Sequence, residues 1–345
     1  MDESTDRWIS IDTAAEATDP VLPAESSALL DLLARLRSSR VRFDRMSCAD
    51  VAGQLAAAIS RPIDTILCSS LDADLTAPLN LAVASDHVAA VSSSVQWLAG
   101  ATGATRMLFV VDRAAVPPAL ETRPGVMRIG HAYPQLHPSL LLRIALRRRL
   151  SPGRLPTDAG VIAIDAAAAW ALWQVIRGVA PQRLKLPWVL HDLLTQKSAF
   201  ALAPAGLEVG ELARAAGLLS GEALRSITVQ SGPRLINRAI APGTALRDAG
   251  EWTAHFAPPS PQTPADACTR CGWCHAVCPS GVEPVLILEA AQACDRGASV
   301  VLAERAGIDD CVRCGLCQFV CPSRLPLLRA IDSIATRDRA TASAR

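Results

Sequence analysis

The sequence has no marked excess of charge of either sign. Its 345 residues include 34 lysines and arginines and 33 aspartates and glutamates, which leaves a formal net charge of +1. Proteins that bind nucleic acid need concentrated positive charge to meet the phosphates, so the composition does not favour nucleic acid as a partner. Half of the residues are hydrophobic, and a chain of this length can form two or three domains with apolar cores.

Long uninterrupted apolar runs and a basic amino terminus are also missing. The most apolar stretch, residues 159–180, is interrupted by Asp165, Gln174 and Arg177. It is therefore expected to form a short buried strand and an alanine-rich helix, because its apolar length is too short for a bilayer. The first six residues are acidic and polar, unlike the start of a secretory signal. We expect a cytoplasmic protein.

Patterns for acid–base catalysis or for a single metal ion are absent as well. The six histidines have no H-x₃-H or similar spacing, and Asp44, Asp72 and Asp74 have no partner pattern that indicates general acid–base chemistry. No catalytic residue is assigned. Three of the eleven cysteines have no mutual spacing and are expected to be reduced, buried thiols: Cys48, Cys68 and Cys294.

The other eight cysteines form two copies of one motif. The first copy runs from Cys268 to Pro279 and the second from Cys311 to Pro322, and both read C-x₂-C-x₂-C-x₃-C-P. This spacing is typical of a [4Fe–4S] cluster, because the iron atoms of a cubane take soft thiolate ligands and a tight loop can place three of them round one cube. Zinc sites and disulfides are the alternatives, but the exact repeat of spacing and closing proline favours two clusters.

In twin motifs of this kind, the fourth cysteine of each run binds the other cluster. Gly272 and Gly315 follow the second cysteine of each run, where the backbone must pass close to a bulky cofactor. Pro279 and Pro322 redirect the chain and help to send the last thiolate to the partner cluster. Two neighbouring clusters predict electron transfer. The expected ligand sets are Cys268, Cys271, Cys274 with Cys321, and Cys311, Cys314, Cys317 with Cys278.

Residues 26–182 are expected to form an α/β layer with a mostly parallel sheet, because strand and helix patterns alternate there. The expected strands are 65–68, 106–111, 126–129 and 160–164. The expected helices are 28–37, 79–98, 138–149 and 166–176.

Shorter segments follow in residues 183–256 and fit a small β-grasp-like α+β module. Its expected strands are 184–190, 200–202 and 226–229, and its expected helix is 207–218. Residues 257–265 contain a proline-rich linker, which leads into a ferredoxin-type domain over residues 266–336 with helices at 285–295 and 327–335. Residues 1–25 are expected to form a flexible lead, and residues 337–345 a tail.

In this order of modules the chain resembles RnfC, the peripheral subunit of the Rnf electron-transport complex. The likeness is carried by Tyr133-Pro134-Gln135, by residues 155–162 and 227–233, and above all by the two motifs, their separation and the run from 310 to 326. The resemblance implies a layer like the flavin-binding subunit of complex I, an SLBB-type β-grasp module and a twin [4Fe–4S] domain. It also implies protein redox partners in a larger oxidoreductase complex, with a peripheral place on the inner face of the cell membrane.

The chain departs from this family where the family binds FMN and NADH. The family has a glycine-rich loop that should fall near residues 37–48, but no glycine occurs before Gly53, and side chains such as Arg42, Phe43 and Arg45 would fill the space of a nucleotide phosphate. A Gly-Gly-Glu-Lys segment is replaced by residues 136–139, and the acidic stretch facing the nicotinamide is altered at residues 68–74. We expect the layer to bind neither FMN nor NAD and to serve as a scaffold or docking surface.

The sequence therefore predicts an iron–sulfur subunit that relays electrons through two [4Fe–4S] clusters between a redox donor and a partner oxidoreductase. Two alternatives stay open. One is an FMN-dependent NADH or corrinoid reductase, and the other is an assembly subunit in which the clusters are structural.

Overall fold

The computed structural model describes residues 7–11, 25, 28–44, 46–48, 50–74, 76–220, 227–259, 264–293 and 296–342. The chain divides into two compact units. The first consists of residues 1–150 and 155–259, and the second of residues 151–154 and 260–345.

A parallel four-stranded sheet lies in the first unit, with the order β4-β3-β2-β5. Leu67 in the central strand β2 pairs with Leu108 of β3 and with Ala163 of β5. Every residue of β2 and β5 is buried, as expected for parallel strands that are covered on both faces. All four strands were predicted and are confirmed: β2 (Thr65–Ser69), β3 (Arg106–Asp112), β4 (Val126–Ile129) and β5 (Val161–Asp165).

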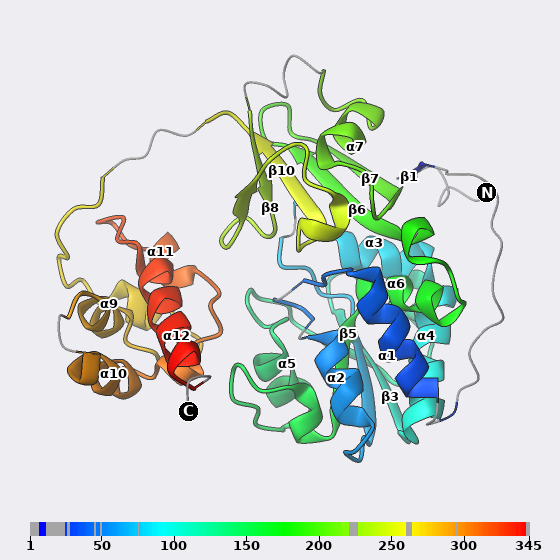
Figure 1. Cartoon of the computed structure of the whole chain (residues 1–345), viewed down its shortest axis with the longest axis horizontal. Coiled ribbons are helices and arrows are strands. Elements are labelled where there is room, and N and C mark those ends of the chain that lie inside the picture. Colours follow the sequence, from blue (N-terminus) through cyan, green and yellow to red (C-terminus); the bar gives the residue numbers. More distant parts are fainter. Residues whose placement is uncertain are drawn as a thin grey trace. The chain divides into compact units, whose positions relative to one another are not determined.

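Helices cover this sheet, and α4 and α6 pack against each other and against β2 (Figure 1). The predicted helix 166–176 is confirmed without change. The single helix predicted over 79–98 is wrong, because the chain leaves the helical conformation at His87 (φ −123°, ψ 29°). The His87 ring packs against Trp8 and Trp170. The helices are α1 (Ala28–Ser39), α2 (Val51–Ala58), α3 (Leu79–Asp86), α4 (Val88–Thr102), α5 (Pro138–Leu146) and α6 (Ala166–Ile176).

A mixed six-stranded sheet follows in the same unit, in the order β1-β7-β6-β10-β8-β9. The β6–β7 hairpin is antiparallel, whereas β10 runs parallel to β6 and antiparallel to β8. Trp188 and Phe256 are fully buried in its core. The elements are β1 (Trp8–Ser10), β6 (Lys185–Asp192), β7 (Lys197–Pro204), α7 (Val209–Ala215), β8 (Thr228–Ser231), β9 (Arg238–Ile240) and β10 (Thr253–Ala257).

Three strands of this sheet were not predicted, namely β1, β9 and β10. Strand β1 lies within the stretch expected to be a flexible lead, and it pairs in parallel with β7. Strands β6, β7 and β8 confirm the predicted ones with shifted ends, and residue 226, the expected start of β8, lies outside the described residues. Helix α7 is shorter at both ends than the predicted 207–218.

The second unit is helical. Helix α9 packs against α10 and α12, and Ile287, Leu327 and Ile331 are buried in the shared core. Helix α10 was not predicted, and α12 extends to Ala342, into the stretch expected to be a tail. The helices are α8 (Trp273–Ala276), α9 (Pro284–Gln292), α10 (Arg296–Arg305), α11 (Leu316–Phe319) and α12 (Leu327–Ala342). Across the described ranges of both units, no helix has the length and apolarity needed to cross a membrane.

Candidate cluster-binding site

The two cysteine loops have the same backbone conformation. Gly272 and Gly315 have identical angles (φ 79°, ψ −5°) and stand at the start of the short helices α8 and α11. Arg270 and Arg313, two residues earlier in each loop, both have φ of 53°. This left-handed region is uncommon for residues with a side chain, so its occurrence at equivalent positions means that the repeated sequence dictates a repeated turn.

The conformation of Gly272, rather than a protein neighbour, requires glycine there. A Cβ atom placed on Gly272 would meet no protein atom within 4 Å, whereas its positive φ disfavours any larger residue. The turn that each glycine permits leads directly into a four-residue helix that carries the third cysteine of the motif.

Backbone amides in these loops point at cysteine sulfur atoms. The Arg270 N–H donates to Cys268 Sγ at 3.4 Å, and in the second loop Arg313 N–H donates to Cys311 Sγ at the same distance. Val282 N–H donates to Cys278 Sγ at 3.3 Å. Such donors favour the thiolate form of a cysteine, which is the form that binds metal.

Cys321, the last cysteine of the second motif, lies in electrostatic range of the first motif. Burial raises the pKa of the Cys274 thiol, and negative charge on Cys271 and Cys321 raises it further. Helices α8 and α11, which carry Cys274 and Cys317, are also in contact.

The reciprocal arrangement holds for Cys278, the last cysteine of the first motif. Burial raises the pKa of Cys311 to about 11, with further contributions from negative charge on Cys314 and Cys278. Burial raises the pKa of Cys317 to about 12, and Cys311, Cys314 and Cys278 again add to the shift. Each motif thus has the last cysteine of the other among its neighbours, which is the juxtaposition that crossed ligand sets need.

The donor set fits a cubane. All ten described cysteines are free of disulfide bonds, so each is available to bind a soft metal as its thiolate. Within the described residues, no three His, Cys, Asp or Glu side chains are arranged to hold one common ion. A cubane makes a different demand, because each of its four thiolates binds a different iron atom.

The three remaining cysteines have no part in these loops. Cys48 and Cys68 are buried and free, as predicted. Burial raises the pKa of both thiols well above the usual value, so they are inert as nucleophiles at neutral pH. Cys294 lies outside the described residues.

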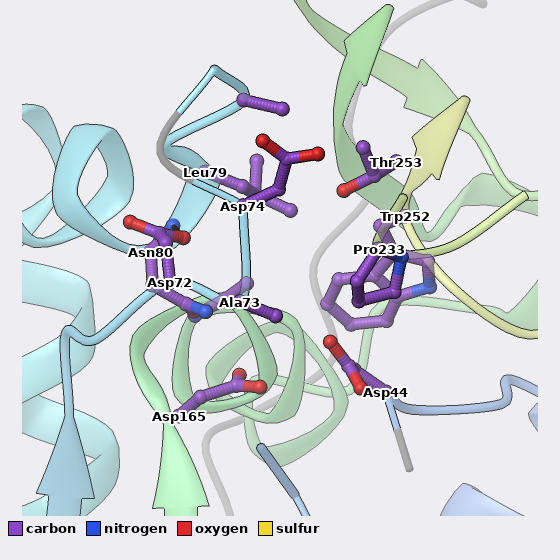
Figure 2. Close-up of a pocket in the computed structure, with 12 residues that line it drawn as sticks. Asp44, Asp72, Ala73, Asp74, Leu79, Asn80, Asp165, Pro233, Trp252 and Thr253 are labelled. Atoms are coloured by element: carbon purple, nitrogen blue, oxygen red, sulfur yellow. Dashed lines mark hydrogen bonds between the residues drawn. The ribbon is translucent and has the colours of Figure 1, made fainter. Parts of the chain in front are cut away.

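A pocket of about 400 Å³, partly open to solvent, lies in the first unit at the carboxyl ends of β2 and β5. The strand order turns between these two strands, since β3 and β4 continue on one side of β2 and β5 pairs on the other. Ligands of open α/β sheets bind at such a point. Figure 2 shows Asp72, Asp74 and Asp165 on one side of the pocket and Pro233 with Trp252 on the other, with Asp44 below Pro233 and Trp252.

Carboxylates already occupy the helix amino termini that face this pocket. Asp72 accepts hydrogen bonds from Asn80 N–H (2.6 Å) and Leu81 N–H (3.0 Å) at the start of α3. Asp165 accepts one from Ala168 N–H (2.7 Å) at the start of α6 and another from the Ser47 hydroxyl. Free amide groups at helix amino termini are the groups that usually bind a phosphate. At α3 and α6, carboxylates of this chain already accept hydrogen bonds from these amides.

Burial dominates the electrostatics of this pocket. It raises the pKa of Asp72 to about 8 and that of Asp165 to about 6, although the hydrogen bonds from backbone amides act in the opposite direction. The caps were missed in the sequence. For Asp165 a signal existed, because an aspartate directly before an apolar helical pattern is a typical N-cap.

The residues expected to obstruct a nucleotide have definite places. Phe43 packs against Trp252 with ring centroids 5.5 Å apart, and Trp252 lines the pocket. His137, in the segment that replaces Gly-Gly-Glu-Lys, caps α5 by accepting a hydrogen bond from Ser139 N–H. Arg42 is exposed, and Arg45 lies outside the described residues.

Comparison with known proteins gives a likeness of fold. No protein-family model matches the chain, and no curated protein matches it. A chain of an NAD⁺-reducing [NiFe]-hydrogenase in the H₂-reduced state matches with a TM-score of 0.51 and 12% identity, covering 93% of this chain and 63% of that one. The air-oxidized state of an NAD⁺-reducing [NiFe]-hydrogenase matches with a TM-score of 0.50 and 12% identity, covering 83% and 55%.

This chain therefore spans less than two thirds of the length of either hydrogenase chain. Its mixed α/β architecture with a parallel sheet is similar to theirs, and at 12% identity the similarity concerns the fold.

Proposed function

We propose that this protein is an electron-transfer component of an oxidoreductase complex that carries two [4Fe–4S] clusters. The observation that carries the proposal is the pair of cysteine loops, with the same backbone turn in both and with the last cysteine of each among the neighbours of the other. Cys268, Cys271, Cys274 and Cys321 would hold one cluster. Cys311, Cys314, Cys317 and Cys278 would hold the other.

A bound cluster of this type supplies one-electron storage at a potential set by its surroundings. The protein's own part is to present thiolates and to direct amide N–H groups at their sulfur atoms. The amides of Arg270 and Arg313 do so at the first cysteine of each motif. A relay function is favoured over a purely structural one because two such sites share one small helical unit.

We infer that the six-stranded sheet contains a β-grasp module of the SLBB type. The strand order β7-β6-β10-β8-β9, with an antiparallel hairpin, an intervening helix α7 and a parallel central pair, supports this inference. Together with the likeness to RnfC, it favours a role in which this unit anchors the cluster domain to partner subunits. The hydrogenase chains of similar fold also favour protein partners within an oxidoreductase complex.

We further infer that the parallel sheet layer binds neither FMN nor NAD. The amino termini of α3 and α6 are capped by Asp72 and Asp165, and a phosphate placed there would meet carboxylates instead of free amides. The repulsion between a phosphate and a buried, partly ionised carboxylate adds to the loss of hydrogen bonds. The layer then acts as a scaffold within the complex, and the likeness to RnfC implies a peripheral place on the inner face of the membrane.

Iron and acid-labile sulfide counts on protein purified without oxygen test the proposal. We expect about eight irons per chain, and fewer than about five would overturn it. Replacing Cys278 or Cys321 by serine should reduce the iron content, whereas Cys294→Ser, the matched control, should keep it.

Two further readouts separate the alternatives. Acid precipitation should release no flavin, and a yellow extract together with NADH oxidation would favour a flavin-dependent reductase instead. Dithionite should reduce the clusters and produce an EPR signal, and clusters that resist reduction would favour the structural role.

A further inference from the structure

The two cysteine loops have the same backbone but different surroundings. Cys268 and Cys271 in the first motif are exposed, whereas the equivalent Cys311 is half-buried and Cys314 is buried. The residue directly before the third cysteine differs in the same sense. Trp273 in the first motif is 61% exposed, and Leu316 at the equivalent position is half-buried.

The chain leading into each motif explains the difference. Residues 264–270, before and within the start of the first motif, are all exposed and form no helix or strand. The second motif follows α10 and a short 3₁₀ helix (Ile308–Asp310), which place Ala303, Ala306 and Ile308 in the core of the second unit. Cys311 packs against that same core. The environment of Cys311 therefore arises inside the second unit.

Exposure bears on the reduction potential of a bound cluster. Reduction adds a negative charge, and a charge is better stabilised near water than in an apolar interior. Exposed thiolates therefore favour a higher reduction potential, since burial and hydrogen bonding to sulfur are among the factors that set it. The hydrogen bond to the first cysteine is the same length in both motifs. Val282 N–H donates one more to Cys278, in the second site, so the proposed order of potentials takes exposure as the stronger of the two factors.

We propose that the site formed by Cys268, Cys271, Cys274 and Cys321 exchanges electrons with the external protein partner and has the higher potential, while the site of Cys311, Cys314, Cys317 and Cys278 is the interior one. This inference rests on the proposed function. The partner is a protein with a one-electron centre near its surface. One electron leaves the donor and one reaches the acceptor, and no bond or proton transfer is involved.

EPR of the reduced protein tests the order of the two sites. A soluble paramagnetic dysprosium chelate should shorten the relaxation of one cluster signal more than the other. Cys268→Ser and Cys311→Ser, at equivalent positions, assign each signal to a motif. We expect the signal altered by Cys268→Ser to respond more strongly to the chelate and to titrate at the higher potential.

A second pair of variants leaves all eight ligands in place, in case a serine variant does not fold. Arg270 and Arg313 occupy the same loop position with the same φ, and Arg270→Gln or Arg313→Gln should lower the potential of its own cluster by removing a nearby positive charge. The signal shifted by Arg270→Gln should be the one that the chelate affects most.

The outcomes are distinct. If the Cys311 and Arg313 variants identify the accessible, higher-potential signal, or if both signals respond equally, the proposed order is overturned although the two clusters are real. An iron content below that of two clusters would instead overturn the proposed function itself.

Discussion

Asp72 should make the first unit less stable as the pH rises from 7 to 8. Its carboxyl group is buried, and burial raises its pKa from 3.8 to about 8 in the folded chain, with Asp165 and Asp44 adding negative charge nearby. At pH 7 the folded chain therefore keeps a proton on most Asp72 side chains, and the unfolded chain keeps almost none. The folded state binds more protons, so the free energy of unfolding falls as the pH rises through this range.

The size of the effect follows from the two pKa values. Integrating the difference in bound protons between pH 7 and pH 8 gives a loss of about 1 kcal/mol. Asp165, whose pKa is raised to about 6, has released nearly all of its proton by pH 7. Burial lowers the pKa of His87, His137 and His255, so these groups add stability as the pH rises, mostly below pH 7.

A comparison of wild type with the variant Asp72→Asn isolates the effect of Asp72, because Asp165 and the three histidines are present in both proteins. Asparagine keeps one oxygen that can accept an N–H bond at the start of α3 and cannot ionise. Urea unfolding of the full chain at pH 7.0, 7.5 and 8.0 can be followed by tryptophan fluorescence, since six of the seven tryptophans lie in the first unit.

The free energy of unfolding of wild type should fall by about 1 kcal/mol relative to Asp72→Asn over this range. Asp50→Asn, at the exposed cap of α2, is the matched control and should keep the wild-type pH dependence. An identical pH dependence in wild type and Asp72→Asn, or a wild-type protein that gains stability relative to the variant, would refute the reasoning.

Two other predictions concern the cysteine loops. Gly315→Ala should lower the stability of the second unit by about 1–2 kcal/mol and reduce the iron content, because alanine is strained at a φ of 79°. The control Gly297→Ala, within α10, should leave stability unchanged or raise it. Equal iron content in the two variants would contradict the expectation. Trp273→Leu, which copies Leu316 of the second motif, should slow electron transfer to a protein partner several-fold, because exposed tryptophans are frequent contacts at interfaces. Iron content and the rate with ferricyanide should stay unchanged, and an unchanged rate with the protein partner would count against a contact at Trp273.

Local patterns in the sequence were sufficient to predict the strands of the parallel sheet. Its strands are apolar runs such as Ile66–Cys68, which are buried on both faces, so no alternation with polar residues obscured them. The helix beginning at Ala166 was equally clear. The helix from Leu79 was predicted to run too far, because His87 is an acceptable helical residue, and its contacts with Trp8 and Trp170 cannot be read from a local window.

The strands that were missed depend on distant partners. Strand β1 has three residues and exists as an edge strand on β7, almost two hundred residues later. Strand β10 pairs with β6 and β8 across the centre of the sheet, but its sequence Thr253–Ala257 offers only one large apolar residue, Phe256. Short strands of this kind are stabilised by pairing and burial rather than by their own propensity.

The cysteine loops and the pocket of the first unit differ in the same way, because the loops depend on local sequence and the pocket depends on distant residues. The spacing of the cysteines is a local property, and it predicted a turn that both loops adopt with equal angles at Gly272 and Gly315. The pocket is a non-local property, because it brings together residues after β2 and at the end of β5 with Trp252, which lies directly before β10 of the other sheet. From the sequence, the expected loss of a nucleotide site was inferred from missing glycines, obstructing side chains and altered segments at residues 68–74 and 136–139.

The proposal that the layer binds neither FMN nor NAD has a separate physical argument, because Asp72 and Asp165 already accept hydrogen bonds at the two helix amino termini of the pocket. If the missing glycines were the only obstacle, replacing the side chains near residue 43 would be enough to admit a phosphate. With the caps in place it would not, because each helix would first have to release a buried carboxylate that its own amides hold. Under this proposal, the redox chemistry of the chain would depend on its cysteine loops.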